Sequence, residues 1–312
     1  MVQAITLGIM FMISLIGNTL MVYSLTRRRR LKKYSSSIYN LIFHLSIADL
    51  LVTVTCLLGE AVWTYSVSWV ADNFTCKLLK FSQMFSLYLS TFVLVLIGLD
   101  RWTAVKYPMK ALSRRRTCNR FVLTIWVLSL ILSSPQILVF HVNKGPFYEE
   151  FYQCVTYGSY KEKWQEDVYI ITSIFLMFIL PLVVIIWSYV CTFISLTQSE
   201  KQFRAEMESR RLLTPELNRR RLIHRARTKS MRIFFVIVIA FVFCWTPYYF
   251  TMIVFQFHEP DQKLAEDLQN GIFFFGMSNS LINPVIYGAF HLRKPRHERR
   301  NTKSSRYELS TL

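Results

Sequence analysis

Apolar stretches of similar length recur along the chain and are separated by short polar segments. Seven of them are long enough to cross a bilayer as helices, since about 20 apolar residues at about 1.5 Å rise each cover the hydrocarbon core. They run over residues 2–26, 38–64, 76–105, 118–140, 167–197, 231–257 and 267–290. The pattern predicts an all-α membrane protein, a bundle of seven transmembrane helices.

One domain is expected, because no linker rich in Pro, Gly or Ser and no repeat interrupts this pattern. Residues 1–290 form the predicted bundle. Residues 291–312 are predicted to begin as a short amphipathic helix on the membrane surface and to end as a short cytoplasmic tail.

The charges of the chain are distributed unevenly. Hydrophobic residues make up 53% of the sequence and charged residues only 18%, which is unusual for a soluble domain. The net charge of +18 is concentrated in basic clusters at 27–33, 114–116, 219–232 and 293–300. These clusters share one side of the membrane if the helices alternate in direction, and the positive-inside rule makes that side cytoplasmic. The N-terminus is therefore expected outside a plasma membrane, and anionic lipid or a cytoplasmic protein is a better partner for the clusters than nucleic acid.

Short motifs occur in order along the apolar stretches. They are Gly17-Asn18, Leu45 to Asp49, Asp100-Arg101-Trp102, Trp126, Pro181 with Tyr189, Cys244-Trp245-Thr246-Pro247 and Asn283-Pro284-Val285-Ile286-Tyr287. An Asn-Pro pair inside an apolar helix is costly, because proline removes a backbone bond and the amide needs a protein partner. Together these motifs resemble rhodopsin-like G-protein-coupled receptors over nearly the whole chain. Such receptors usually carry an extracellular tail, so a sequence that begins beside its first helix is expected to be a fragment.

The resemblance implies a set of residues that switch the receptor between two states. A carboxylate at Asp49 costs about 2.5–3.5 kcal/mol within the membrane and needs polar partners. Arg101 is expected to be held by Asp100 in the quiet state, because no acid stands before the sixth stretch to hold it instead. Pro247 is expected to act as a hinge. The full set is Asp49, Asp100, Arg101, Trp245, Pro247, Asn283, Pro284 and Tyr287.

Two of the six cysteines are expected to pair. Cys76 lies about 38 Å from Arg101 if the residues between them form one helix, so it reaches the outer surface. Cys154, in the long outer loop, is its only comparable partner, and the receptor pattern contains the same pair. The cysteines at 56, 118, 191 and 244 are expected to remain reduced. Asn73-Phe74-Thr75 is a glycosylation sequon, but its closeness to the bilayer favours the unmodified form.

A cation site also follows from the resemblance. Four polar residues match the sodium-binding cluster of rhodopsin-like receptors: Asp49, Ser90, Asn279 and Ser280. One carboxylate with several neutral oxygens suits a small hard cation. An allosteric sodium ion is the one cofactor expected.

Three further stretches are similar to the receptors for gonadotropin-releasing hormone, adipokinetic hormone and corazonin, and most of all to invertebrate corazonin receptors. They are residues 86–92, residues 105–110, and the loop 144–154 followed by Trp164-Gln165-Glu166. This similarity implies a short amidated peptide as ligand and a heterotrimeric G protein, mainly of the Gq type, as partner. Arrestin and a receptor kinase are further partners of such receptors.

The same similarity implies a peptide pocket near the outer ends of the helices. Its residues are Glu60, Gln83, Met84, Tyr248, Tyr249, Met252 and Phe273. Aromatic side chains there would bury the apolar parts of the peptide, while Glu60 and Gln83 would bind its N–H groups.

Several alternatives remain at this stage. An adipokinetic-hormone-like or gonadotropin-releasing-hormone-like peptide is the nearest alternative ligand. A retinal protein would need a lysine within residues 267–290, which contain none. An enzyme would need histidines and acids clustered at membrane depth, and a transporter would show paired broken helices. The sequence shows neither feature, so no catalytic activity is expected.

Overall fold

The computed structural model describes residues 2–30, 37–107, 111–145, 150–209, 235–254 and 262–291. These residues are almost entirely helical. The helices are α1 (Val2–Arg30), α2 (Ser37–Val52), α3 (Gly59–Ser66), α4 (Asn73–Lys106), α5 (Ala111–Ser133), α6 (Pro135–Val139), α7 (Lys163–Ile174), α8 (Leu180–Ser209), the helix Phe235–Val254 and α10 (Gln262–His291). The strands β1 (His141–Lys144) and β2 (Tyr152–Val155) form one antiparallel hairpin.

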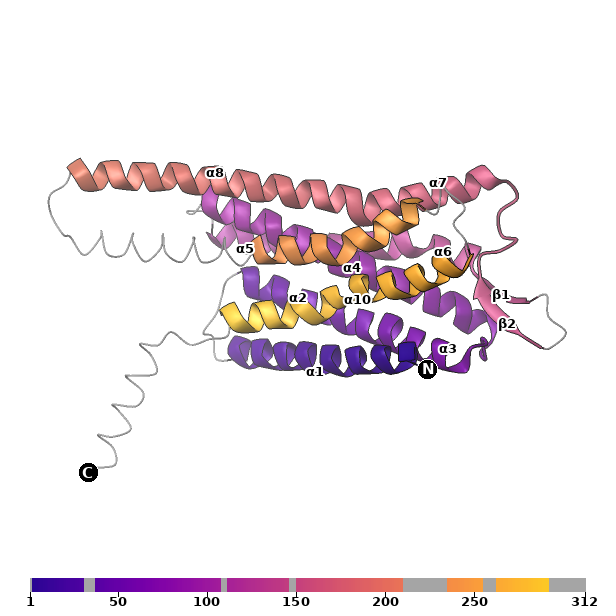
Figure 1. Cartoon of the computed structure of the whole chain (residues 1–312). Coiled ribbons are helices and arrows are strands. Elements are labelled where there is room, and N and C mark those ends of the chain that lie inside the picture. Colours follow the sequence, from indigo (N-terminus) through magenta and orange to yellow (C-terminus); the bar gives the residue numbers. More distant parts are fainter. Residues whose placement is uncertain are drawn as a thin grey trace, which may run out of the picture.

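Two π-helical turns join shorter helices into longer ones. The turn η1 (Thr53–Leu58) connects α2 to α3, and the turn η3 (Phe175–Ile179) connects α7 to α8. The described chain thus forms seven long helices that run side by side, each where an apolar stretch predicted it (Figure 1). Two ends of the bundle can be told apart: the hairpin end, where β1 and β2 lie, and the opposite end, where α1 finishes with Arg27–Arg30.

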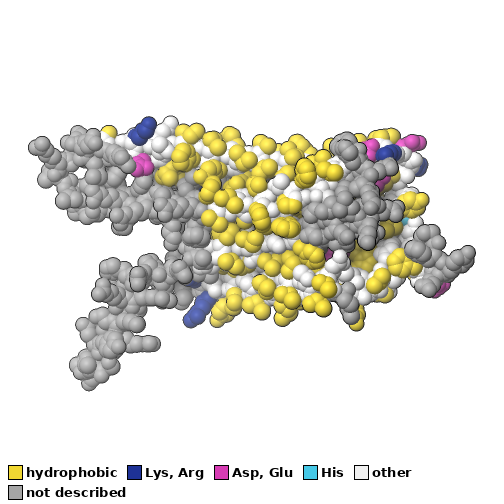
Figure 2. Space-filling model, viewed as in Figure 1, with side chains coloured by type: hydrophobic (Ala, Val, Ile, Leu, Met, Phe, Trp, Pro, Cys, Tyr) yellow, Lys and Arg dark blue, Asp and Glu magenta, His cyan; other side chains and the backbone are white. Residues whose placement is uncertain are grey.

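Six of the long helices in the described part of the chain are long and apolar enough to cross a membrane. The seventh, α10, has sufficient length, but polar residues between positions 278 and 283 make it less apolar. Figure 2 shows apolar side chains covering the middle of the molecule, with charged side chains near the two ends. Large apolar side chains point outwards in this belt, among them Leu20, Leu123 and Val183. Such a surface suits lipid and not water, so the chain is a multi-pass membrane protein.

The helix α4 lies at the centre of the bundle. In its most apolar window, 67% of the residues are buried, compared with 22% in α1. Leu89 and Val93 of α4 and Leu41 of α2 are fully buried. Because α4 also packs against α5 and α8, side chains along its length reach several other helices.

Gly17 of α1 faces Pro284 of α10 at a close approach. A Cβ atom on Gly17 would lie 3.2 Å from the Cβ of Pro284, so a larger side chain would push the two helices apart. Small residues commonly permit such contacts between membrane helices. Pro284 itself lies inside α10, where it removes one backbone hydrogen bond.

The hairpin is held to the bundle by covalent and backbone bonds. Cys76, in the first turn of α4, forms a disulfide with Cys154 of β2, which confirms the predicted pair. The backbone N–H of Trp69 donates to the carbonyl of Tyr152 at 2.7 Å. The segment between α3 and α4, to which Trp69 belongs, begins at Val67, which has a φ of 60°. The hairpin of β1 and β2 is therefore attached to this end of the bundle, while residues 146–149 of the loop lie outside the described residues.

Candidate functional site

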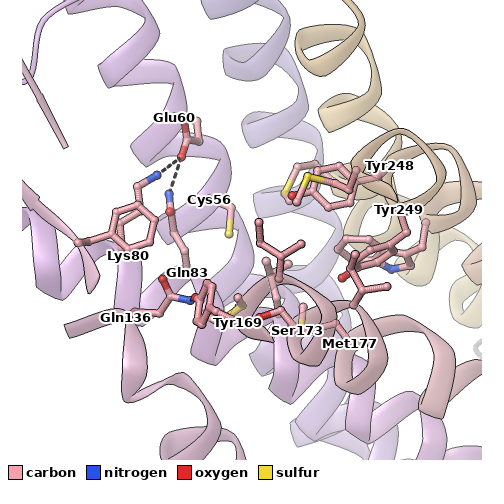
Figure 3. Close-up of a pocket in the computed structure, with 18 residues that line it drawn as sticks. Cys56, Glu60, Lys80, Gln83, Gln136, Tyr169, Ser173, Met177, Tyr248 and Tyr249 are labelled. Carbon is pink, nitrogen blue, oxygen red and sulfur yellow. Dashed lines mark hydrogen bonds and ion pairs between the residues drawn. The ribbon is translucent and has the colours of Figure 1, made fainter. Parts of the chain in front are cut away.

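A cavity of about 270 Å³ lies between the helices towards the hairpin end. Its walls come from η1, α3, α4, α6, α7, η3, the helix Phe235–Val254 and α10 (Figure 3). Six of the seven residues predicted to bind a ligand line it: Glu60, Gln83, Met84, Tyr248, Tyr249 and Met252. The side chain of Phe273 lies outside the described residues. The structure thus brings together residues from three separate parts of the sequence, as the prediction requires.

One wall of the cavity is polar. The Oε1 atom of Glu60 accepts a hydrogen bond of 2.9 Å from the amide of Gln83 and one of 3.1 Å from the ammonium of Lys80. The same Gln83 amide also donates to the carbonyl of Thr55 at 3.1 Å. Gln83 is nearly buried, so these bonds fix its orientation. Glu60 is consequently an anchored acceptor at the edge of the cavity.

The position of Glu60 depends on the π-helical turn before it. A π turn adds about one residue to a turn of helix and so rotates every following side chain relative to an unbroken α-helix. Thr53, at the start of η1, donates its hydroxyl to the carbonyl of Asp49 at 2.6 Å. Glu60 therefore lines the cavity from a helix that departs locally from uniform α geometry.

The opposite wall is aromatic (Figure 3). The ring of Tyr249 stacks on Phe178 with centroids 4.9 Å apart, and lies 5.7 Å from the ring of Trp245. Trp245 is buried, and Gly276 makes room for it, since a Cβ on Gly276 would be 3.1 Å from the indole. Apolar groups that enter the cavity can therefore contact a ring system that is already packed in place.

Four polar residues of the cavity were not among the predicted residues. They are Lys80, Gln136, Tyr169 and Ser173. Lys80 precedes Gln83 by three residues on one helix, and this spacing alone would have placed both on one face. Gln136 of α6 donates to the hydroxyl of Tyr169 of α7. Neither residue carries a sequence signal, because their meeting depends on how α6 packs against α7.

A second polar cluster lies deeper in the bundle, around Asp49. The carboxylate is fully buried. Ser90 of α4 donates to Oδ1 at 2.7 Å, and Asn283 of α10 donates to Oδ2 at 2.9 Å. Asn18 of α1 donates to the carbonyl of Ser280 at 3.1 Å. The motifs of four helices therefore meet in one hydrogen-bonded network.

Among the four residues predicted to bind sodium, the described hydrogen bonds join one pair. Asp49 and Ser90 are bonded directly, but the hydroxyl of Ser280 donates to the carbonyl of Met277 at 3.0 Å and lies 3.5 Å from that of Ser14. The amide nitrogen of Asn283 donates to the second carboxylate oxygen of Asp49. The Oδ1 atom of Asn283 is buried without a described hydrogen-bond partner. The side-chain atoms that could bind a cation here are all oxygens, which fits a small hard cation. Across the described residues, no group of three His, Cys, Asp or Glu side chains could hold a metal ion.

The opposite end of α4 holds the switch residues Asp100 and Arg101. Arg101 forms an ion pair with Asp100, and the side chains are 14% and 3% exposed. Trp102 meets Trp187 of α8 with ring centroids 4.9 Å apart, in an edge-to-face arrangement. Tyr287, in the last turns of α10, is also buried. The segment before the helix Phe235–Val254, where an acid was noted to be missing, lies outside the described residues.

Comparisons with known proteins agree with this arrangement. The family model described as "7 transmembrane receptor (rhodopsin family)" matches residues 17–287. The chain is 35% identical to a gonadotropin-releasing hormone receptor of Octopus vulgaris over 96% of this chain and 73% of that protein. It is 33% identical to a gonadotropin-releasing hormone II receptor of Clarias gariepinus over 90% of this chain and 73% of that protein. It is 31% identical to a gonadotropin-releasing hormone receptor of Rattus norvegicus over 86% of this chain and 81% of that protein.

Proposed function

The chain belongs to the rhodopsin family of seven-transmembrane receptors, as its motifs predicted, and on this premise we propose that it is a plasma-membrane receptor for a short amidated neuropeptide. The cavity carries this proposal. Its polar wall offers Glu60 to peptide N–H groups, and its aromatic wall offers Tyr248 and Tyr249 to apolar side chains.

A corazonin-like peptide is the first candidate ligand. The similarity of residues 144–154 to corazonin receptors supports it. The relatives reported above are named as gonadotropin-releasing hormone receptors, so a peptide of that type or of the adipokinetic-hormone type is the second candidate. All three are peptides of one receptor group, so the candidates differ in sequence and not in chemical class.

The hairpin end is proposed to face outwards. A disulfide between Cys76 and Cys154 requires an oxidising compartment, which the extracellular side provides. Arg27–Arg30 lie at the opposite end of α1, where the positive-inside rule expects the cytoplasm. This orientation places the N-terminus outside and the ion pair of Asp100 with Arg101 inside, next to a G protein.

Signalling is proposed to occur as a population shift between two packed states. A peptide in the cavity presses on the aromatic group around Trp245, and the helix Phe235–Val254 swings outwards about Pro247. Arg101 and Tyr287 then rearrange to admit a helix of the G protein, which we take to be of the Gq type. Arrestin and a receptor kinase would act on the same cytoplasmic face. No covalent bond changes in this process.

A sodium ion is proposed to favour the quiet state. Asp49, Ser90 and the buried Oδ1 of Asn283 would hold it, and the ion would supply a positive charge beside the buried carboxylate. The test is peptide binding to membranes in sodium chloride and in N-methyl-D-glucamine chloride at equal ionic strength. We expect the peptide to bind more weakly in sodium chloride. In Ser90→Ala this difference between the two salts should disappear. Equal binding in the two salts would overturn this proposal.

The function is tested by intracellular calcium in cells that express the chain. Corazonin, adipokinetic-hormone-like, gonadotropin-releasing-hormone-like and vasopressin-like peptides are applied in turn. We expect a low-nanomolar response to one of the first three. Glu60→Gln should weaken it, whereas Glu162→Gln, an exposed acid outside the cavity, should not. Silence across the panel with surface expression verified would contradict the proposal, and a Gq inhibitor distinguishes the type of G protein.

A further inference from the structure

Lys80 places a positive charge inside the proposed peptide cavity. Its Nζ atom lies 3.1 Å from Oε1 of Glu60, and the two side chains are only 13% and 21% exposed. Glu60 and Lys80 are the charged members among the described residues that line the cavity. The formal charges of these lining residues therefore cancel.

The ammonium of Lys80 is fixed by more than its ion pair. It lies 4.4 Å from the ring centroid of Trp63 and 5.7 Å from that of Phe140. Trp63 is itself held, because its indole N–H donates to the amide oxygen of Gln153 at 2.8 Å. Cation–π contacts with these two aromatic rings keep the charge beside Glu60. Lys80 is thus part of a built site that joins α3, α4 and the hairpin.

Only one oxygen of Glu60 is used by this site. Both Lys80 and Gln83 donate to Oε1, and no described residue donates to Oε2 (Figure 3). A ligand can therefore reach Oε2 with an uncharged N–H group. A cationic ligand group at the same place would gain little, since the charge of Glu60 is already neutralised and the Lys80 ammonium is close enough to repel it.

We propose that Lys80 sets the charge specificity of the cavity: by neutralising Glu60 it selects the uncharged end of a peptide over a cationic one. This inference rests on the proposed function and deepens it by naming the chemistry of the peptide segment that enters. Lys80 acts on the ligand through Glu60 and through its own charge.

The test uses the most potent peptide of the panel. Each uncharged residue of that peptide is replaced in turn by arginine in one series and by citrulline, its neutral analogue of similar shape, in the other. The potency ratio of each citrulline analogue to its arginine counterpart measures the penalty for charge at that position. The ratios are determined for the unmodified receptor, Lys80→Met, Glu60→Gln and the double variant.

The ratios should follow the formal charge of the cavity. At the positions that enter it, Lys80→Met should lower the penalty for arginine about tenfold and Glu60→Gln should raise it about tenfold. The double variant, neutral again, should return to the ratio of the unmodified receptor. Lys77→Met removes a lysine from the same helix but outside the cavity lining, and should leave every ratio unchanged.

The outcomes separate the two proposals. Ratios that stay equal in all four receptors while the peptide still activates them would overturn the role of Lys80 and leave the receptor function standing. If Lys80→Met does not reach the cell surface, Glu60→Gln still tests the role of Lys80. An unchanged penalty for arginine in Glu60→Gln would then overturn it. Absence of any peptide response in the unmodified receptor would instead overturn the proposed function, and the role of Lys80 with it.

Discussion

The amide of Asn283 donates to the buried carboxylate of Asp49 at 2.9 Å, although 234 residues separate them in the chain. This bond joins α2 to α10. Ser90 occupies the other carboxylate oxygen from α4, so three helices meet at one charge. A rearrangement of α10 must therefore break or replace a hydrogen bond to Asp49.

Exchanging the two residues tests this relationship. Asp49→Asn should reduce the maximal peptide response several-fold, because two amides then face each other without the charge. Asn283→Asp should be worse, since two carboxylates would be buried together. The double variant restores one carboxylate and one amide, and we expect recovery of most of the response. Surface expression is measured alongside, and a double variant no better than the single ones would contradict a direct interaction.

Removing the charge of Asp100 should raise basal signalling. Asp100→Asn leaves Arg101 without its ion-pair partner on the same helix, and a buried charge that loses its partner favours another conformation. We expect basal inositol phosphate production to increase about two- to tenfold, a shift of about 1 kcal/mol between states. Thr103→Val is the control, because among the described residues that hydroxyl bonds only to carbonyls of its own helix. Unchanged basal activity in Asp100→Asn would show that other contacts hold the quiet state.

Gly276 should be intolerant of a methyl group. In Gly276→Ala the new Cβ would lie 3.1 Å from the indole of Trp245, which must then move by a few tenths of an ångström. Overpacking of this kind costs about 1–3 kcal/mol. We expect a lower melting temperature of the purified receptor and altered peptide potency. Gly288→Ala, on the same helix, meets no described atom within 4 Å beyond the adjacent backbone of its own helix, and should change neither.

The stability of the receptor should depend on Asp72 at acidic pH. Asp72 caps α4 by accepting the backbone N–H of Thr75 at 2.9 Å, and hydrogen bonds from Thr75 hold the pKa of its carboxyl below the ordinary 3.8. The charged form is thus the one that stabilises the fold. Its contribution is complete above the ordinary pKa and is lost as the pH falls through the lowered one.

Thermal unfolding of the purified receptor between pH 3 and pH 6 measures this contribution. Asp72→Ala should lower the melting temperature at pH 6, because the helix loses its cap. The difference from the unmodified receptor should shrink towards pH 3. Asp72→Asn keeps a neutral cap and should lack this part of the pH dependence. A constant difference between Asp72→Ala and the unmodified receptor at all pH values would argue against the carboxylate as its source.

The number and positions of the long helices could be predicted from the sequence because the membrane restricts the choices. A stretch of about 20 apolar residues must satisfy its backbone internally, and a helix does so. The disulfide was predictable for a similar reason, since only Cys76 and Cys154 could both reach one outer surface. The need of Asp49 for polar partners also followed from its depth alone.

The identity of those partners was a matter of tertiary structure. Asn279, Ser280 and Asn283 all lie within five positions of α10, and a small rotation of the helix decides which one faces Asp49. The motif predicts the first two at a cation site, which stays a prediction, and the structure shows that Asn283 donates to the carboxylate. The close approach of Pro284 to Gly17 restricts how far α10 can rotate at this point.

The sequence by itself thus determined the family, the number and order of the membrane helices and the disulfide, because each follows from length, spacing or a motif. Its resemblance to a receptor group named six of the eighteen side chains that line the cavity. Only the tertiary structure decided the chemistry of the polar wall. The π turn over Thr53–Leu58 orients Glu60, and the packing of α3 against α4 then brings Lys80 within 3.1 Å of it. Both depend on side chains of different helices fitting together, which no local pattern encodes.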